Sequence, residues 1–159
     1  MDTVFAISKI CKKFGGVQAL TNVDMEIKEG ELLGLVGDNG AGKTSILEAL
    51  AVLSKGRSFR PGHVASLIGP SSDCLQVIAK VESRAGETHQ LGLERGADYW
   101  QARHQGKDVR QISELTRLLP FVLLEPSSHT LISGPPDGRR KYLDWGVFHV
   151  KHGFLALWR

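Results

Sequence analysis

The sequence has few of the features that are typical of secreted proteins, of proteins stabilised by a structural metal, or of membrane-spanning proteins. Its 159 residues include only two cysteines, Cys11 and Cys74, and its six histidines show no ligand spacing, so neither a disulfide scaffold nor a zinc module is expected. No apolar run reaches the roughly 18 residues of a spanning helix, and the first residues lack the basic and apolar segments of a secretory signal. We therefore expect a cytoplasmic protein with no membrane insertion.

The charge imbalance is also small. Twenty Lys and Arg against 17 Asp and Glu give a net charge of +3, which permits a nucleic-acid partner without arguing for one. Hydrophobic residues make up 42% of the chain, enough to form a core. The length corresponds to one ordinary domain or two small ones.

A change of hydrophobic period surrounds a glycine-rich segment. Residues 4–7 suggest a short strand, and residues 23–27 alternate between apolar and polar, which predicts a half-buried strand. The nearly continuous apolar run Leu32–Val36 predicts a strand covered on both faces. After the glycines, residues 46–53 place their apolar side chains on one face of a helix. The glycine-rich segment is therefore expected between a buried strand and an amphipathic helix.

That segment fulfils the phosphate-loop pattern G-x-x-x-x-G-K-[S/T]. Glycines let backbone N–H groups point inward as an anion cradle, and the start of the following helix adds the positive end of its dipole. Lys43 can reach the β- and γ-phosphates, and the Thr44 hydroxyl can ligate the Mg²⁺ that bridges them. A glycine-rich turn without ligand is the alternative. The predicted ATP–Mg²⁺ site, with Thr44 as metal ligand, consists of Gly37, Asp38, Asn39, Gly40, Ala41, Gly42, Lys43, Thr44 and Ser45.

The rest of the chain mixes strands and helices. An antiparallel meander of three strands is expected near residues 75–81, 88–93 and 99–103. Residues 112–119 predict a helix that stops at Pro120, and residues 121–124 predict a further apolar strand. Residues 134–138 predict a Gly/Pro loop, after which a helix is expected to begin at Arg139.

The first part of the chain, about residues 5–45, resembles ABC-transporter ATPase subunits of the sugar-importer type. The resemblance rests on Lys13-Phe14-Gly15-Gly16-Val17-Gln18-Ala19-Leu20 and on residues 37–43. In that family an aromatic residue just before the glycines stacks on adenine, which implies this role for Phe14. An ordinary half-buried aromatic is the alternative reading of Phe14.

From about residue 44 to residue 159 the chain resembles the RecF family of bacterial DNA replication and repair ATPases. Residues 45–50 and 56–60 contribute, and the most distinctive stretch is Gly-Pro-Pro-Asp-Gly-Arg-Arg-Lys-Tyr-Leu-Asp-Trp at residues 134–145. The resemblance implies recombinational repair at stalled forks and DNA gaps, with ATP and Mg²⁺ as cofactors. It also implies double-stranded or gapped DNA, RecO and RecR as partners, and a head-to-head dimer.

Both families share one ATPase head, so we predict an α/β fold of the P-loop NTPase, ABC-ATPase type. The expected organisation is a P-loop core start at residues 1–56, an antiparallel β subdomain with a helix at residues 57–120, and a RecF-like segment at residues 121–159. No apolar run ends in two acidic residues, and no signature-like Ser-Gly-Gly-Gln occurs. We therefore expect a truncated first lobe with no catalytic residue and little hydrolysis of its own.

Four arginines are candidates for contacts with DNA phosphates. Arg57 and Arg60 follow the phosphate-loop helix, and Arg139 and Arg140 follow the Gly/Pro loop. The alternatives are a solvated basic loop for the first pair and, for the second, a solvated helix start or an ion pair with Asp144.

Tyr99 and Trp100, beside Arg103, suggest either a stacking platform for bases or core packing, and their expected strand favours the core. Three functions stay open: a RecF-like DNA repair ATPase fragment, a fragment of a transporter ATPase subunit, and an inactive chimeric fragment.

Overall fold

In the computed structural model the chain forms two compact units, Met1–Phe121 and Val122–Arg159. The structure describes residues 3–14, 17–60, 68, 73–83, 86–151 and 153–154.

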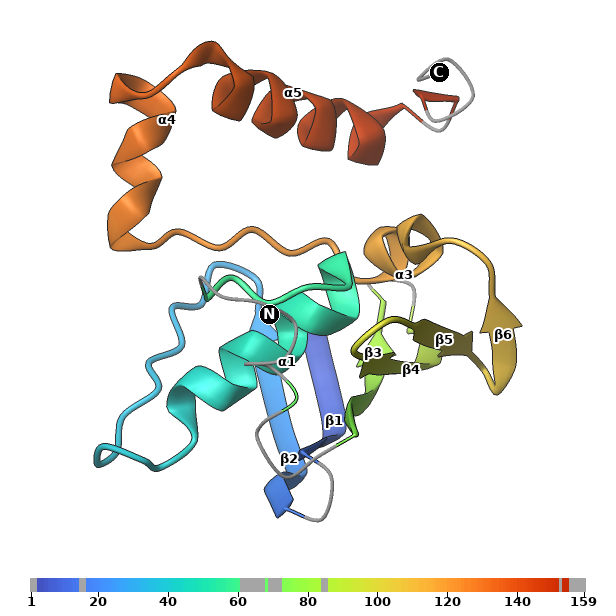
Figure 1. The fold of residues 1–159 in the computed structure, drawn as a ribbon. Coiled ribbons are helices and arrows are strands. Elements are labelled where there is room, and N and C mark those ends of the chain that lie inside the picture. Colours follow the sequence, from blue (N-terminus) through green and yellow to red (C-terminus); the bar gives the residue numbers. More distant parts are fainter. Residues whose placement is uncertain are drawn as a thin grey trace. The chain divides into compact units, whose positions relative to one another are not determined.

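A six-stranded antiparallel sheet forms the base of the first unit (Figure 1). Its strand order is β2-β1-β3-β4-β5-β6. The strands are β1 Thr3–Phe14, β2 Val17–Lys28, β3 Cys74–Glu82, β4 Thr88–Gly96, β5 Trp100–His104 and β6 Lys107–Val109. The predicted meander is confirmed as β3 to β5, and β1 and β2 extend the same sheet, with β1 pairing antiparallel to β3. The short β6 was not predicted.

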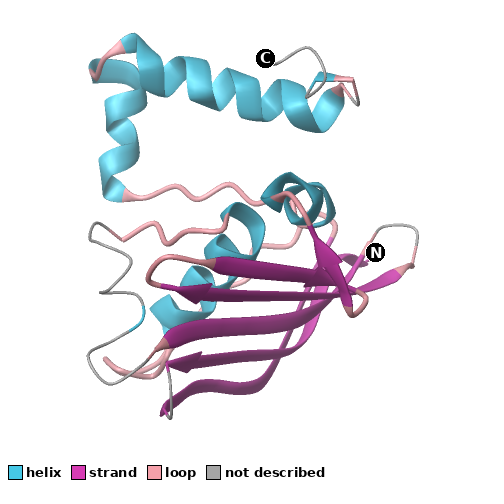
Figure 2. Cartoon of the chain, turned by 45° about the vertical axis from the view of Figure 1, so that its right-hand side comes forward, coloured by secondary structure: helices cyan, strands magenta, loops and turns pink. Residues whose placement is uncertain are grey.

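One face of this sheet is apolar because its strands alternate. In β3 the side chains of Leu75, Val77 and Val81 are buried, whereas Gln76 and Ile78 point to the opposite face. The helix α1, Lys43–Lys55, lies across the apolar face (Figure 2). The core between helix and sheet contains Ile7, Ile10, Leu20, Ala49, Leu50, Val52, Leu53, Leu75, Val77, Ala79, Val81, Leu91, Leu93, Ala102, Leu115 and Leu119.

The end of α1 is fixed against a second helix, α3 (Ile112–Leu118). Gly56 ends α1 in a left-handed conformation (φ 67°), and a Cβ there would lie 3.2 Å from Ile112. The Ser54 hydroxyl donates to the carbonyl of Leu119 at 2.7 Å. Both helices are confirmed, and α3 ends before Pro120 as predicted.

The predicted buried strand at Leu32–Val36 is wrong. Residues 31–38 form no regular element, and Leu32 and Val36 are 97% and 96% exposed. A run of apolar residues becomes a covered strand only where neighbouring strands form hydrogen bonds with its N–H and C=O groups. After the turn at Glu29-Gly30 the chain leaves the sheet, and no described strand pairs with it.

The second unit is helical. It contains the 3-10 helix η1 (Pro126–His129), the short α4 (Thr130–Ser133) and α5 (Pro136–Val150). The predicted strand at residues 121–124 is wrong, because these residues form no strand and Leu124 is exposed. The helix expected from Arg139 begins earlier, at Pro136, since proline suits the first helical turn. In the part of the chain that the structure describes, no helix is both long and apolar enough to cross a membrane.

Candidate nucleotide-binding site

The glycines of the phosphate loop occupy conformations that other residues avoid. Gly40 has φ 91° and Gly42 has φ 87°, both in the left-handed region. Gly42 is the N-cap residue directly before α1, and a Cβ there would lie 3.4 Å from Cδ2 of Leu20. The backbone therefore turns sharply from the loop into the helix, as the sequence pattern predicts.

This turn opens a polar cavity at the start of α1. No described side chain caps the helix, and its first hydrogen bond runs from the Ile46 N–H to the Gly42 carbonyl at 3.0 Å. The cavity, of about 220 Å³, is lined by residues 39–45 and by Arg60. Uncapped N–H groups at a helix start attract anions, so the cavity suits a phosphate group.

Lys43 is folded back onto the loop. Its ammonium group donates to the carbonyls of Gly37 and Asp38, the latter at 2.8 Å. These bonds hold the loop closed around the lysine, and a bound phosphate would replace the carbonyls as partner of the ammonium. Thr44 is exposed at the cavity.

The residues present fit Mg²⁺ only as an ion that arrives with a nucleotide. Mg²⁺ prefers six oxygen ligands and keeps several waters and phosphate oxygens among them. Thr44 can supply one hydroxyl, and no group of three or more His, Cys, Asp or Glu that could hold a metal occurs among the described residues. Phosphate oxygens and water would have to complete the shell.

Phe14 ends β1, where its Cα pairs with Leu75 on one side and Val17 on the other. Its side chain lies outside the described part of the structure, so stacking on adenine stays a prediction.

The two arginines after α1 differ in their surroundings. Arg60 lines the phosphate-loop cavity, and its Nε lies 3.7 Å from Oε1 of Glu48. Arg57 is exposed and is not among the residues that line this cavity. The structure thus brings Arg60, but not Arg57, to the predicted phosphate site.

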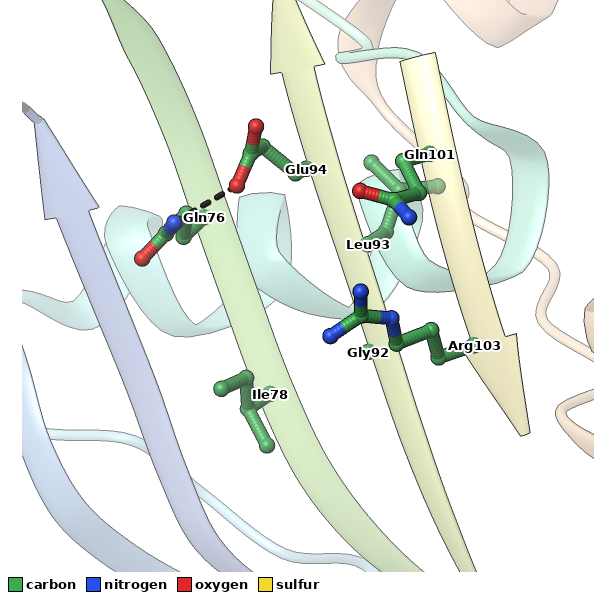
Figure 3. Close-up of a pocket in the computed structure, with 7 residues that line it drawn as sticks. All are labelled: Gln76, Ile78, Gly92, Leu93, Glu94, Gln101 and Arg103. Atoms are coloured by element: carbon green, nitrogen blue, oxygen red, sulfur yellow. Dashed lines mark hydrogen bonds between the residues drawn. The ribbon is translucent and has the colours of Figure 1, made fainter. Parts of the chain in front are cut away.

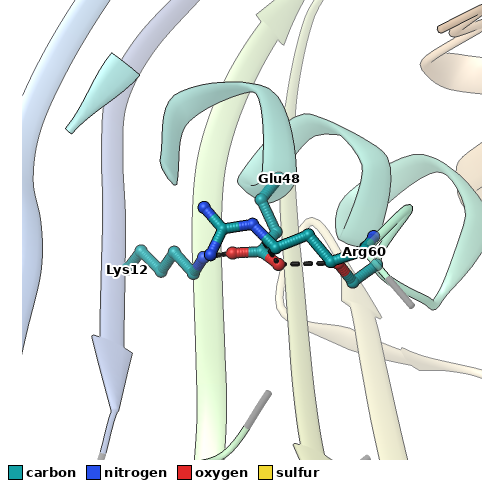
Figure 4. Close-up of polar contacts among 4 residues, drawn as sticks. Lys12, Glu48 and Arg60 are labelled. Atoms are coloured by element: carbon teal, nitrogen blue, oxygen red, sulfur yellow. Dashed lines mark hydrogen bonds and ion pairs between the residues drawn. The ribbon is translucent and has the colours of Figure 1, made fainter. Parts of the chain in front are cut away.

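Sequence reasoning missed a buried ion pair behind the loop. Lys12 on β1 and Glu48 on α1 point toward each other, with Nζ 2.5 Å from Oε2 (Figure 4). Burial lowers the pKa of Lys12, although the hydrogen bond and charge of Glu48 counteract this effect. Burial also opposes ionisation of Glu48, but hydrogen bonds from Lys12 and Ser58 outweigh it and hold the pKa of the carboxyl below its usual value. The only signal in the sequence is a charge within the apolar stretch of residues 46–50.

In the second unit Arg139 and Arg140 have protein partners. One Arg139 nitrogen, Nη1, donates to the carbonyls of Leu131 and Gly134, at 3.2 and 2.9 Å. This arginine therefore caps the carbonyl groups at the C-terminal end of α4. Arg140 pairs with Asp137 at 3.2 Å, one turn earlier on α5, rather than with Asp144. Both members of that pair are exposed.

A hollow lies on the polar face of the sheet. Gly92 lies between Ile78 and Arg103 in register, and its missing side chain leaves a gap between them (Figure 3).

The predicted core packing of Tyr99 and Trp100 is not observed, since these residues are 48% and 37% exposed. Tyr99 directly precedes β5, and Trp100 is the first residue of that strand.

The sheet, the helix that starts at the phosphate loop and the polar cavity define a P-loop nucleotide-binding domain. The profile of the ABC transporter family matches residues 20–125, and the chain belongs to that family.

Curated relatives give a more particular likeness. The chain is 42% identical over 146 residues to the DNA replication and repair protein RecF of Thioalkalivibrio sulfidiphilus, covering 91% of this chain and 40% of that protein. It is 48% identical over 129 residues to RecF of Xanthomonas oryzae pv. oryzae, covering 79% of this chain and 36% of that protein. The predicted resemblance is confirmed, and the chain spans about two fifths of the length of these relatives.

A solved structure shares the fold. The structure of the recombination mediator protein RecF with ATP in the RecFOR pathway superposes with a TM-score of 0.73 at 23% identity, covering 96% of this chain and 40% of that chain. The α/β P-loop fold with an antiparallel sheet is therefore confirmed.

Proposed function

We propose that the chain binds ATP together with Mg²⁺ at the phosphate loop. The observation that carries this proposal is the cavity lined by residues 39–45, into which the uncapped start of α1 opens. Lys43 supplies a mobile cation for the β- and γ-phosphates, and Thr44 supplies a hydroxyl for the metal. The solved RecF structure that contains ATP supports the choice of nucleotide.

Titration with a fluorescent ATP analogue tests the proposal. Wild-type protein should bind in a Mg²⁺-dependent manner, and Lys43→Ala should weaken binding at least about tenfold, because a charge-assisted contact with phosphate is lost. Arg110→Ala, which removes an exposed cation outside the cavity, is the matched control and should bind like wild type. Equal affinities for wild type and Lys43→Ala would refute nucleotide binding at this loop.

We also propose a role in bacterial DNA repair, because curated relatives are named DNA replication and repair protein RecF. RecO, RecR and a second head of the same kind are the partners that this role suggests. Arg57 and Arg140 are the strongest of the four candidates for DNA phosphates. Arg57 is exposed, and the exposed pair of Arg140 with Asp137 is weak enough for a phosphate to replace it. Arg60 is a weaker candidate because it lines the cavity proposed for the nucleotide, and Arg139 is weaker because its guanidinium donates to the carbonyls of Leu131 and Gly134.

The salt dependence of binding to gapped duplex DNA tests this second proposal. Each lost phosphate contact should reduce the slope of log affinity against log salt by about 0.9. Arg57→Ala and Arg140→Ala should each produce such a reduction, whereas Glu114→Gln, an exposed change of the same magnitude and opposite sign, should not. An affinity that is independent of salt would exclude a phosphate-backbone interface.

A second candidate function is that of a transporter ATPase subunit fragment, favoured by the family profile over residues 20–125. Rescue of transport in a strain that lacks an importer ATPase would support it, and we expect no rescue.

A third candidate is an inactive fragment. Thermal unfolding with and without ATP–Mg²⁺ tests it, because a ligand at 100 times its Kd should add about 2.7 kcal/mol to the free energy of unfolding. We propose little ATP hydrolysis by the chain alone.

A further inference from the structure

A buried carboxylate on α1 has no part in the proposed contacts with nucleotide. Glu48 lies five positions after Lys43, is not among the residues that line the phosphate-loop cavity, and points toward Lys12 on β1 (Figure 4). Its side chain is 5% exposed. A buried ion pair contributes little net stability compared with apolar residues of the same shape, so stability alone does not explain a charge at this position.

One oxygen of this carboxylate faces the loop that carries Arg60. Oε1 of Glu48 accepts a hydrogen bond from the Ser58 hydroxyl at 2.6 Å. The Ser58 hydroxyl in turn accepts the backbone N–H of Arg60 at 3.0 Å. The Arg60 guanidinium also lies 3.7 Å from the same Oε1. Glu48 therefore reaches Arg60 by two routes, through Ser58 to its backbone and directly to its side chain.

The other oxygen is fixed from the sheet. Lys12 Nζ lies 2.5 Å from Oε2, and its side chain is fully buried. With Oε2 held by β1, the carboxylate presents Oε1 to Ser58 and Arg60 in one orientation. The sheet, α1 and the loop after α1 are thus connected through a single side chain.

The direct contact with Arg60 is weak enough to yield to a ligand. Its 3.7 Å separation exceeds hydrogen-bond length, and the Arg60 side chain is 53% exposed. A phosphate in the cavity that Arg60 lines would take over the guanidinium, while the bonds through Ser58 keep the backbone in place.

We infer that Glu48 is a positioning residue of the nucleotide site, which holds Arg60 at the edge of the phosphate-loop cavity so that its guanidinium favours a nucleoside triphosphate over a diphosphate. This inference rests on the proposed binding of ATP. The discrimination follows from charge, because a triphosphate carries more negative charge than a diphosphate and gains more from an added cation.

The experiment compares Kd values for ATP–Mg²⁺ and ADP–Mg²⁺ in the full 159-residue chain. Arg60→Ala should reduce the preference for ATP about tenfold, the effect of losing one charge-assisted contact. Ser58→Ala and Glu48→Gln should reduce it by about threefold or more. The ratio of the two Kd values is informative because a loss of folded protein alone would weaken both nucleotides equally.

Double variants separate positioning from a merely structural role. Glu48→Gln combined with Arg60→Ala should show no larger loss of preference than Arg60→Ala alone, because Glu48 acts through Arg60. Ser58→Ala keeps the Lys12–Glu48 pair and serves if Glu48→Gln does not fold. Arg110→Ala and Glu114→Gln, which change exposed charges elsewhere in the first unit, should keep the wild-type ratio.

The outcomes distinguish this inference from the proposal beneath it. Wild-type protein that binds neither nucleotide would overturn both. Wild-type protein that binds ATP while Ser58→Ala and Glu48→Gln keep its preference would overturn the positioning role and leave ATP binding intact. Losses that add in the double variant would also overturn the positioning role. The positioning role would be supported if the variants changed the ratio of the Kd values for ATP–Mg²⁺ and ADP–Mg²⁺, and if the double variant lost no more preference than Arg60→Ala alone.

Discussion

The Nζ atom of Lys12 lies 2.5 Å from Oε2 of Glu48, and the two side chains are 0% and 5% exposed. This contact joins residues 36 positions apart in the sequence. The contact connects β1 to α1, the helix that follows the phosphate loop.

Removal of one partner of this pair should destabilise the first unit strongly. Lys12→Met leaves the Glu48 carboxylate buried without its nearest cation, at a cost of about 3–5 kcal/mol. Lys12→Met combined with Glu48→Leu removes both charges and should cost much less than the single change. Urea denaturation measures these differences, with Lys107→Met, a change of an exposed lysine on β6, as the control. A single variant within about 0.5 kcal/mol of wild type would contradict a buried pair.

The same pair predicts a dependence of stability on pH. The pKa of Glu48 is lower in the folded protein than its ordinary value of about 4.3. Its ionised form therefore stabilises the fold above that value, and this contribution is lost as the pH falls through the lowered pKa. The stability difference between wild type and Glu48→Gln should narrow on acidification below about pH 4.3. A difference that stays constant down to the acid transition would contradict the lowered pKa.

Gly42 should tolerate substitution poorly because of its backbone. Its φ is 87°, and an added Cβ would lie 3.4 Å from the Leu20 side chain. Gly42→Ala should therefore cost about 1–2 kcal/mol and weaken nucleotide binding. Gly34→Ala is the control, since that glycine has no positive φ and no atom within 4 Å of an added Cβ. Similar unfolding curves for the two variants would show that the left-handed turn is dispensable.

Tyr99 should titrate late. Its hydroxyl donates to Glu94 Oε1 at 2.7 Å, and this hydrogen bond raises the pKa of Tyr99 to about 12. Absorbance at alkaline pH should show one of the two tyrosines ionising well above the ordinary value of about 10. Tyr99→Phe should remove that step, and Glu94→Gln should shift it down. A late step that persists in Tyr99→Phe would contradict the raised pKa of Tyr99.

The exposed segment after β2 should be insensitive to polar substitution. Leu32→Ser should change the free energy of unfolding by less than about 0.5 kcal/mol, because the side chain is 97% exposed. Leu53→Ala, which empties a fully buried position on α1, should cost about 2–5 kcal/mol. A large cost for Leu32→Ser would show that residues 31–38 are packed in solution.

Local patterns accounted for much of the fold. The strands of the meander and the helices α1 and α3 are predictable from the spacing of their apolar residues. That spacing has a period of 2 in the strands and of 3.6 in the helices, and it involves only residues close together in the sequence. The helices η1 and α4 and the strand β6 were missed, since each is too short to show a period. The apolar runs at residues 32–36 and 121–124 misled for the opposite reason: they report a preference for burial but do not supply the partner strand.

The candidate site likewise has one part that local sequence predicts and one part that depends on tertiary contacts. The phosphate loop is recognisable because its glycines, Lys43 and Thr44 lie close together in the sequence, directly before the start of the helix that follows. The contributions of Lys12, Ser58 and Arg60 depend on where β1 and the loop after α1 meet Glu48 in space. Nothing in the local sequence distinguishes Arg60 from its neighbour Arg57.

The sequence by itself thus determined the phosphate loop, its helix and the antiparallel meander, because each is encoded by residues within a few positions of one another. Only the tertiary structure decided which charges are buried together and which arginine lines the cavity. Those contacts join β1, α1 and the loop after it, and their geometry is set by how the helix packs on the sheet.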